Sequence, residues 1–267
     1  MTSGAARLEV DEGLAVLSLE QAETGNLLDE GMLTALLEAA DLLQRYRLKS
    51  GGTVRAVLIR SSGANFCFGG DVQRFHDAGA ELPMVISSLT GLFHDLLSRL
   101  DGLEVPTVAA VGGSAAGGGL ALACACDLIV AGSSARFLFA YPRIGLSPDG
   151  GVSLTLTRKV GSARALDWAL TNRSVSADEA WTAGLVSRVV ADDALDVESR
   201  QLAGELAHGP TLALAATKRL VLDSWNRTAM QQMGEEAEAM SGLGRTGDAR
   251  EGVASFLAKR APRFSGT

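Results

Sequence analysis

The sequence predicts an α/β protein in which parallel strands alternate with helices. The main observation is an apolar run at residues 107–111 that is followed by glycines and by a small-residue helical segment at 120–124. A second apolar run, residues 128–131, comes directly after this segment. A strand, a helix and a strand in succession are typical of a parallel sheet, because the helix returns the chain to the end where the first strand began.

The first sixty residues contain another such unit, preceded by a hairpin. Residues 7–10 and 14–20 alternate between apolar and polar side chains around Asp11-Glu12-Gly13, which indicates a β-hairpin. Asn26 and Asp29 introduce a segment whose apolar residues recur with helical spacing. A loop at Ser50-Gly51-Gly52 and a strand at residues 54–60 follow.

The remaining chain is expected to be mixed up to residue 191 and helical beyond it. After a glycine-bearing turn at 61–71 we expect a helix at 92–103, a strand at 136–140, an irregular loop at 141–151, helices from 153 interrupted at Gly161 and Gly184, and a strand at 185–190. Residues 192–267 are predicted to be helices broken at Gly209-Pro210 and at 241–247. We therefore expect a core at 1–191 that carries the site, and a helical region at 192–267 that packs on the core or on a partner chain.

Composition excludes several classes of protein. Apolar residues make up 47% of the 267 residues and charged residues 21%, which is typical of a soluble globular protein. The net charge of -7 and the absence of a Lys/Arg cluster argue against nucleic acid as a partner. No apolar run reaches the roughly 20 residues that a membrane span requires, and the N-terminus lacks the apolar core of a signal peptide. We expect a cytoplasmic protein without a membrane span.

The cysteines and histidines predict neither a disulfide framework nor a metal site. The cysteines form no CxxC pair, so reduced thiols are expected. The histidines are scattered singly, and we interpret them as structural or surface residues rather than metal ligands or members of a triad. These residues are Cys67, Cys124, Cys126, His76, His94 and His208.

Two glycine-bearing turns each follow a predicted strand. One contains Gly69-Gly70, and the other is the run from Gly117 to Gly119 before the small-residue helix. A helix N-terminus leaves backbone N–H groups without intrahelical partners, and glycine lets a ligand approach them. Two such groups facing one carbonyl oxygen would form an oxyanion hole. The alternative is that the glycines only allow tight helix packing; neither a GxxxxGK[ST] loop nor a GxGxxG fingerprint is present.

At these turns the sequence strongly resembles the enoyl-CoA hydratase/isomerase family, also called the crotonase superfamily. The resemblance covers essentially the whole chain, with the motifs in the family's order. The matching segments are residues 66–71 (family pattern F-x-x-G-x-D), 110–127 (A-x-x-G-x-x-x-G-G-G…C-D), 143–151 (R-I-G-L-x-P-D-x-G), 179–190 (E-A-x-x-x-G-L-V-x-x-V-V) and 251–264 (E-G…F-L-x-K-R-x-P-x-F).

The resemblance implies a crotonase-like spiral of βαβ units with a C-terminal helical region used to form a homotrimer, often a dimer of trimers. It implies an acyl-CoA thioester as substrate, with coenzyme A as part of that substrate and no separate cofactor or metal. By position, the N–H groups of Gly70 and Gly118 would stabilise the thioester enolate. One such donor is commonly worth about 3–4 kcal/mol of barrier. The alternative for Gly70 is a turn glycine without a catalytic role.

The positions of two catalytic glutamates depart from the family's hydratases, where they hold a water molecule and move its proton. Here these positions carry Ala121, which has no titratable group, and Tyr141, whose phenol titrates near pH ~10. Asp149 aligns with a position where some isomerases of the family carry an acid. One carboxylate facing an enolate suffices for a 1,3-proton shift. The alternatives are that Asp149 caps the next helix and that Tyr141 lines the tunnel.

Further candidates for substrate binding are Phe68, Gly69, Asp71, Ala121 and Lys259. Phe68 would line the acyl pocket or fill the core, and Asp71 would stabilise its own loop. Lys259 would meet the phosphates of coenzyme A or simply end a helix. Asp127 is interpreted as structural.

These observations predict an enzyme that moves the double bond of an enoyl-CoA, with Gly70, Gly118, Asp149 and Tyr141 as catalytic residues. One alternative is a hydratase-like lyase, hydrolase or decarboxylase that uses a relocated acid. The other is a non-catalytic acyl-CoA-binding subunit that keeps the oxyanion hole without the acids.

Overall fold

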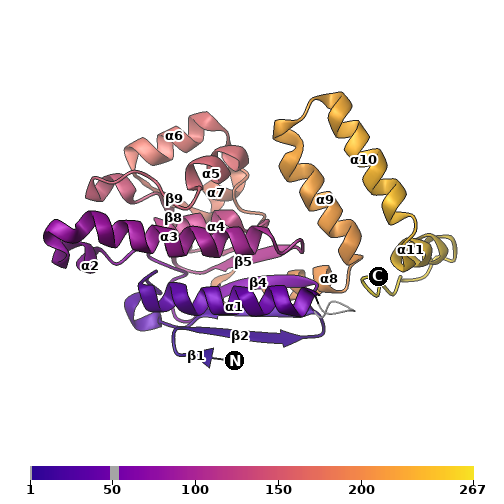
Figure 1. Cartoon of the computed structure of the whole chain (residues 1–267), viewed down its shortest axis with the longest axis horizontal. Coiled ribbons are helices and arrows are strands. Elements are labelled where there is room, and N and C mark those ends of the chain that lie inside the picture. Colours follow the sequence, from indigo (N-terminus) through magenta and orange to yellow (C-terminus); the bar gives the residue numbers. More distant parts are fainter. Residues whose placement is uncertain (1, 49–53) are drawn as a thin grey trace.

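Seven strands form the main sheet of the computed structural model, which describes residues 2–48 and 54–267 (Figure 1). Their order is β1-β2-β3-β4-β5-β7-β10; β1, β2 and β3 are antiparallel, and β3 to β10 are parallel. The parallel part confirms the α/β class. The bounds are β1 Thr2–Ser3, β2 Ala6–Asp11, β3 Leu14–Leu19, β4 Ala56–Ser61, β5 Thr107–Val111, β7 Leu128–Gly132 and β10 Arg188–Val190.

Helices connect most of the parallel strands and form the C-terminal part of the chain. They are α1 Glu30–Leu48, α2 Val72–Asp77, α3 Leu82–Asp101, α4 Gly118–Ala125, α5 Val152–Val160, α6 Ser162–Thr171, α7 Ala177–Thr182, α8 Leu195–Ala207, α9 Thr211–Asp223, α10 Ala229–Leu243 and α11 Gly247–Leu257. In Figure 1, α9, α10 and α11 extend to one side of the body that contains the sheet.

Both faces of the parallel sheet are covered, because successive strand residues point to opposite faces. On β4, Ile59 packs in the cluster that contains Met32 of α1, and α3 lies beside α1. The neighbouring Leu58 packs in a separate cluster with Leu202 of α8. Helix α8 follows residue 191, yet it covers the second face of the main sheet.

A small second sheet brings the two predicted glycine turns together. It consists of β6 Ser114–Ala116, β8 Arg136–Leu138 and β9 Ser174–Ser176. Cys67 bridges to Ala115 of β6: the Cys67 N–H donates to the Ser114 carbonyl at 3.1 Å, and the Ala116 N–H donates to the Cys67 carbonyl at 2.9 Å. The turn at 66–71 therefore lies beside the turn that leads from β6 into α4.

The structure corrects several predicted boundaries. Helix α3 begins at Leu82, ten residues earlier than predicted, and α2 precedes it. Pro83 lies in the first turn of α3, where a missing N–H costs nothing, so it begins the helix rather than breaking it. Strand β9 is too short to give a periodic signal in the sequence, and the predicted strand at 185–190 is limited to β10. The predicted loop at Ser50-Gly51-Gly52 lies outside the described residues.

Asp127 is a structural residue, as its position in the sequence indicated. Its carboxylate accepts from the Thr107 N–H at 2.7 Å and from the Thr107 hydroxyl at 2.9 Å. The same carboxylate pairs with Lys218 of α9 at 2.9 Å, and both side chains are mostly buried. This ion pair fixes the first of the outlying helices to the start of β5.

The three cysteines are buried free thiols, and burial raises the pKa of each from 9.0 to about 12. Unfolded thiols lose their protons above pH 9, whereas the native thiols keep theirs until about pH 12. This contribution to stability is present below pH 9 and is lost as pH rises toward 12.

We expect no reaction of the native protein with an aromatic disulfide reagent at pH 8, and reaction of all three thiols in denaturant. Rapid labelling of the native chain would contradict their burial.

Two further findings concern the described part of the chain. None of its helices is both long and apolar enough to cross a bilayer. Its His, Cys, Asp and Glu side chains form no group of three or more that could hold a metal ion.

Candidate active site

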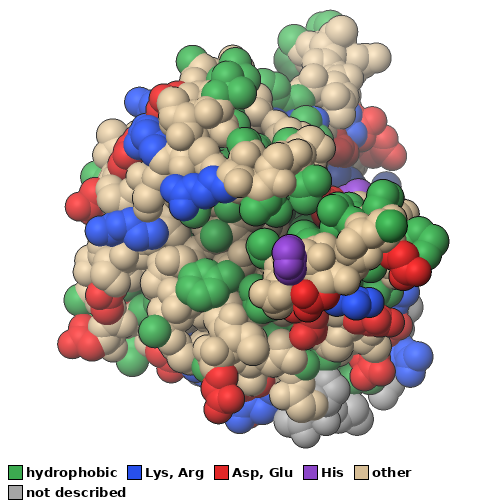
Figure 2. Space-filling view, turned by 90° about the vertical axis from the view of Figure 1, so that its left-hand side faces the viewer, with side chains coloured by type: hydrophobic (Ala, Val, Ile, Leu, Met, Phe, Trp, Pro, Cys, Tyr) green, Lys and Arg blue, Asp and Glu red, His purple; other side chains and the backbone are tan. Residues whose placement is uncertain are grey.

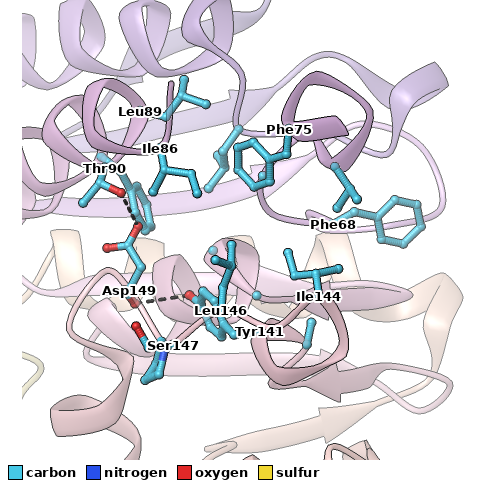
Figure 3. Close-up of a pocket in the computed structure, with 18 of the residues that line it drawn as sticks. Phe68, Phe75, Ile86, Leu89, Thr90, Tyr141, Ile144, Leu146, Ser147 and Asp149 are labelled. Carbon is cyan, nitrogen blue, oxygen red and sulfur yellow. Dashed lines mark hydrogen bonds between the residues drawn. The ribbon is translucent and has the colours of Figure 1, made fainter. Parts of the chain in front are cut away.

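A cavity of about 540 Å³ lies between α2 and α3 on one side and the loop at residues 138–149 on the other. In Figure 3, side chains of α3 and of this loop face each other across it. Figure 2 shows the molecular face on the side of α2, where hydrophobic side chains gather in the middle and most charged side chains lie around them. The apolar lining includes Phe68, Phe75, Ile86, Leu89, Phe93 and Leu146.

Gly70 and Gly118 both line this cavity, and their segments are in contact. Gly118 is the first residue of α4, so its N–H has no partner within the helix. A Cβ built on Gly69 would lie 2.8 Å from the Gly118 nitrogen, which shows how closely the two turns approach. Among the described residues, neither the Gly70 nor the Gly118 amide has a hydrogen-bond acceptor. Two backbone donors are therefore free at one end of an apolar cavity.

The other glycines of the central run serve packing. Gly117 has φ 52° and ψ -120°, a conformation that favours glycine, and it turns the chain into α4. A Cβ on Gly119 would collide with the Cys67 carbonyl. Tight packing thus explains Gly119, whereas Gly118 lines the cavity and its N–H has no acceptor among the described residues.

Asp149 provides the one carboxylate of the cavity lining. This carboxylate lies opposite α3. Its Oδ1 lies 2.6 Å from Nε2 of His94, and its Oδ2 accepts from the Thr90 hydroxyl at 3.2 Å. The Gly150 N–H also donates to Oδ1. Helix α5 begins after Gly151 and has no side-chain cap, so the helix-capping alternative for Asp149 is wrong.

Thr90 and His94 are site residues that sequence reasoning missed. They are four residues apart on α3, so they lie on the same face of the helix. The side chain of His94 is 55% exposed and that of Asp149 is 29% exposed, which places their contact near the rim of the cavity. His94 is partly exposed, in keeping with its interpretation as a structural or surface residue, but its pairing with Asp149 was not predicted.

Tyr141 supports the loop that carries Asp149. Its hydroxyl donates to the main-chain carbonyl of Asp149 at 3.2 Å (Figure 3), and its ring packs edge-on against Phe139. Burial, together with the nearby Asp149 carboxylate, raises the pKa of Tyr141 above its usual value. The phenol therefore stays protonated at neutral pH and acts as a hydrogen-bond donor.

Ala121 is fully buried beneath the site rather than in the cavity lining. A Cβ built on Gly150 would collide with the Phe93 ring and would lie 3.0 Å from the Ala121 Cβ. Gly150 thus lies close to Ala121, whose buried methyl group can neither hold nor activate a water molecule.

Ala121→Glu is expected to destabilise the protein by about 3 kcal/mol or more, because the new carboxylate would be buried without a partner. It is also expected to confer no hydration of a 2-enoyl-CoA. Urea unfolding and product mass measure the two effects. Ala121→Gln, which adds the same bulk without charge, is the matched control. A stable Glu variant that adds water to the substrate would contradict this account of the site.

The remaining predicted binding residues have different positions. Phe68 lines the cavity and is 43% exposed, so it does not fill the core. Gly69 is buried behind Gly70, and its carbonyl accepts from the Leu28 N–H at 2.8 Å. Asp71 caps α2 by accepting from the Arg74 N–H at 3.1 Å, as its loop-stabilising interpretation predicted. Lys259 is exposed beyond α11 and does not line the cavity of its own chain.

The fold and the site define an α/β protein with an apolar cavity, two free backbone donors and one carboxylate, an arrangement suited to holding a polarised carbonyl group. Residues 9–267 match the family model described as enoyl-CoA hydratase/isomerase. The chain therefore belongs to the enoyl-CoA hydratase/isomerase family, whose members act on acyl-CoA substrates, and the resemblance seen in its motifs is confirmed.

Proteins whose names specify different activities are similar to this chain in sequence. The chain is 38% identical to "Probable enoyl-CoA hydratase" of Rhodobacter capsulatus over 260 residues, covering 97% of both chains. It is 35% identical to "1,2-epoxyphenylacetyl-CoA isomerase" of Escherichia coli (96% and 97% covered) and 34% identical to "4-chlorobenzoyl coenzyme A dehalogenase-2" of an Arthrobacter species (83% and 79% covered). The crystal structure of an enoyl-CoA hydratase from a Polaromonas species has a TM-score of 0.90 at 32% identity, with 98% and 100% covered.

Proposed function

We propose that this protein forms the enolate of an acyl-CoA thioester and moves the double bond of an enoyl-CoA by a 1,3-proton shift. The thioester oxygen would accept hydrogen bonds from the Gly70 and Gly118 N–H groups. Asp149 would remove a proton from C2 or C4 and return it to the other carbon. The observation that carries this proposal is a single carboxylate that faces an apolar cavity containing two free backbone donors.

The chemistry follows from where charge develops. Removing the proton moves negative charge onto the thioester oxygen, and fixed N–H dipoles stabilise that charge more strongly in an apolar site than in water. A carboxylate held by neighbouring donors can take a proton and return it within one binding event. The reaction, as proposed, uses neither a bound water nor a metal or redox cofactor; coenzyme A enters as part of the substrate.

Two features support isomerisation over the hydration that several relatives' names specify. Position 121 carries a buried alanine outside the cavity lining, and Tyr141 is a neutral donor whose hydroxyl donates to the Asp149 main-chain carbonyl. Neither position can hold and activate a water molecule as a pair of carboxylates can.

The products of a 3-enoyl-CoA and of a 2-enoyl-CoA test the proposal. Isomerisation gives a product of unchanged mass with the double bond moved, whereas hydration adds the mass of one water. We expect a product of unchanged mass with the double bond moved. Straight-chain and aryl-substituted acyl groups should be compared, because an apolar lining suits both. A product that has gained water from a 2-enoyl-CoA would contradict the proposal.

A hydrolytic reaction at an acyl-CoA is the second candidate, favoured by one observation. The imidazole of His94 lies 2.6 Å from Asp149, and an imidazole beside a carboxylate can also activate water. The dehalogenase relatives make 4-chlorobenzoyl-CoA a suitable test substrate. Release of chloride with uptake of oxygen from ¹⁸O-labelled water would favour this candidate over isomerisation.

We also propose that the exposed apolar side chains of the C-terminal helices form a contact between copies of this chain, in a homotrimer or a dimer of trimers. Met240 of α10 and Phe256 and Leu257 of α11 are each more than three-quarters exposed. Single copies rarely leave such a group of large apolar side chains in water. Phe256→Glu is expected to shift the assembly toward monomers in analytical ultracentrifugation. A wild-type protein that sediments as a monomer would refute this proposal.

A further inference from the structure

The contact between His94 and Asp149 links the cavity to bulk water. Oδ1 of Asp149 and Nε2 of His94 are 2.6 Å apart, and the imidazole is about twice as exposed as the carboxylate. The other ionisable side chains of the cavity lining are Arg143, on the 3-10 turn Tyr141–Ile144, and Tyr141, whose hydroxyl donates to the Asp149 main chain. Among the lining residues, His94 alone pairs with the carboxylate through a titratable group.

The carboxylate is also held on its second oxygen. Thr90 donates to Oδ2 at 3.2 Å, from the same face of α3 that carries His94. The two oxygens thus have different partners: a hydroxyl that only orients the group, and an imidazole that can orient it and exchange protons with it.

We propose that His94 is a positioning residue that also conducts protons between Asp149 and bulk water, so that hydrogens at C2 exchange with solvent during turnover. This inference rests on the enolate reaction proposed above. It adds that the abstracted proton can leave to bulk water, whereas without His94 the proton would return to the substrate.

The proton steps balance without any further reactant. The substrate C–H bond breaks, its electron pair remains in the enolate, and Asp149 becomes a carboxylic acid. At rest the neutral imidazole carries its proton on Nε2; once Asp149 is an acid, the exposed ring gives that proton to water and takes a water proton on Nδ1. The O–H proton of Asp149 then moves to Nε2, and the imidazolium releases its Nδ1 proton to water. The ring then keeps a proton on Nε2 and donates it to the restored carboxylate. The reverse sequence brings a solvent proton to the enolate.

Three variants separate the positioning of Asp149 from proton conduction. In His94→Gln, the side-chain amide can still donate to Oδ1 but cannot pass a proton on. His94→Ala removes both functions. Thr90→Val removes the hydrogen bond to Oδ2 and leaves the imidazole in place. Because His94 is mostly exposed, these changes are expected to leave urea unfolding nearly unchanged.

The experiment follows isomerisation of a 3-enoyl-CoA in deuterated water, with the double bond and the deuterium content of the product read by NMR. The wild type should incorporate solvent deuterium during most turnovers. His94→Gln should keep kcat within several-fold of the wild-type value and should incorporate about tenfold less deuterium per turnover than the wild type. His94→Ala should lose both kcat and deuterium, and added imidazole should restore the deuterium. Thr90→Val should lower kcat while its deuterium content stays at the wild-type level.

Two results would overturn the inference in different ways. If His94→Gln isomerises with the wild-type deuterium content, His94 does not conduct protons, although the enolate reaction stands. If the wild type neither isomerises nor exchanges any acyl-CoA that it binds, the proposed function fails and the proton path fails with it.

Discussion

Asp149→Asn is expected to lower kcat for double-bond migration by about 10²–10⁴-fold, the usual contribution of a positioned general base. The amide has nearly the same shape as the carboxylate and can still accept from Thr90, so binding of a saturated acyl-CoA should change little. The effect should therefore appear in kcat rather than in KM. Steady-state kinetics with a 3-enoyl-CoA, together with titration of a saturated analogue, measure the two quantities.

Asp95→Asn is the matched control for this prediction. Asp95 follows His94 on α3, but it is exposed and does not line the cavity. The same chemical change there should leave kcat within about twofold, as for surface substitutions in general. If Asp149→Asn retains comparable activity with an intact fold, another group is the base.

Gly118→Pro is expected to lower kcat by about 10²–10³-fold because it removes one of the two N–H donors to the enolate oxygen. Such a deletion is possible at this position because Gly118 is the first residue of α4, where proline is well tolerated. The added atoms meet Leu28, whose Cδ1 would lie 2.8 Å from a Cβ and is the flexible end of a side chain.

Gly118→Ala separates the donor from the added bulk. It introduces the same Cβ beside Leu28 but keeps the N–H group. We expect it to retain at least about tenfold more activity than the proline variant, with both variants folded as judged by urea unfolding. Equal losses in the two variants would mean that steric bulk, and not the missing donor, causes the effect.

The main parts of the site could be predicted because their signals are local in the sequence. The glycines at 69–70 and 117–119 follow apolar strands, and the structure places Gly70 and Gly118 on one cavity. Asp149 is close to a glycine-rich turn that resembles a family motif, and its carboxylate faces the same cavity. In each case, the residue and its structural reason lie within a few positions of each other.

The partners of Asp149 could not be predicted, because they come from a helix 55 and 59 residues earlier in the chain. The available signal was weak. Thr90 and His94 are four residues apart among apolar neighbours, which places them on one helix face but does not indicate the residue that they contact. The burial of Ala121 outside the cavity lining could not be predicted either, because it depends on how Gly150 approaches Ala121 in three dimensions. The oligomerisation assigned to residues 192–267 remains a prediction.

Proton exchange at C2 of a saturated acyl-CoA tests the central claim most directly, because it needs only the enolate and exchange of the Asp149 proton with solvent. The thioester is incubated with the protein in deuterated water, and loss of the C2 proton signal is followed by NMR. The account predicts exchange by the wild type that is lost in Asp149→Asn and strongly reduced in Gly118→Pro relative to Gly118→Ala. Binding of acyl-CoA esters without exchange at any chain length would contradict it and would favour a binding subunit.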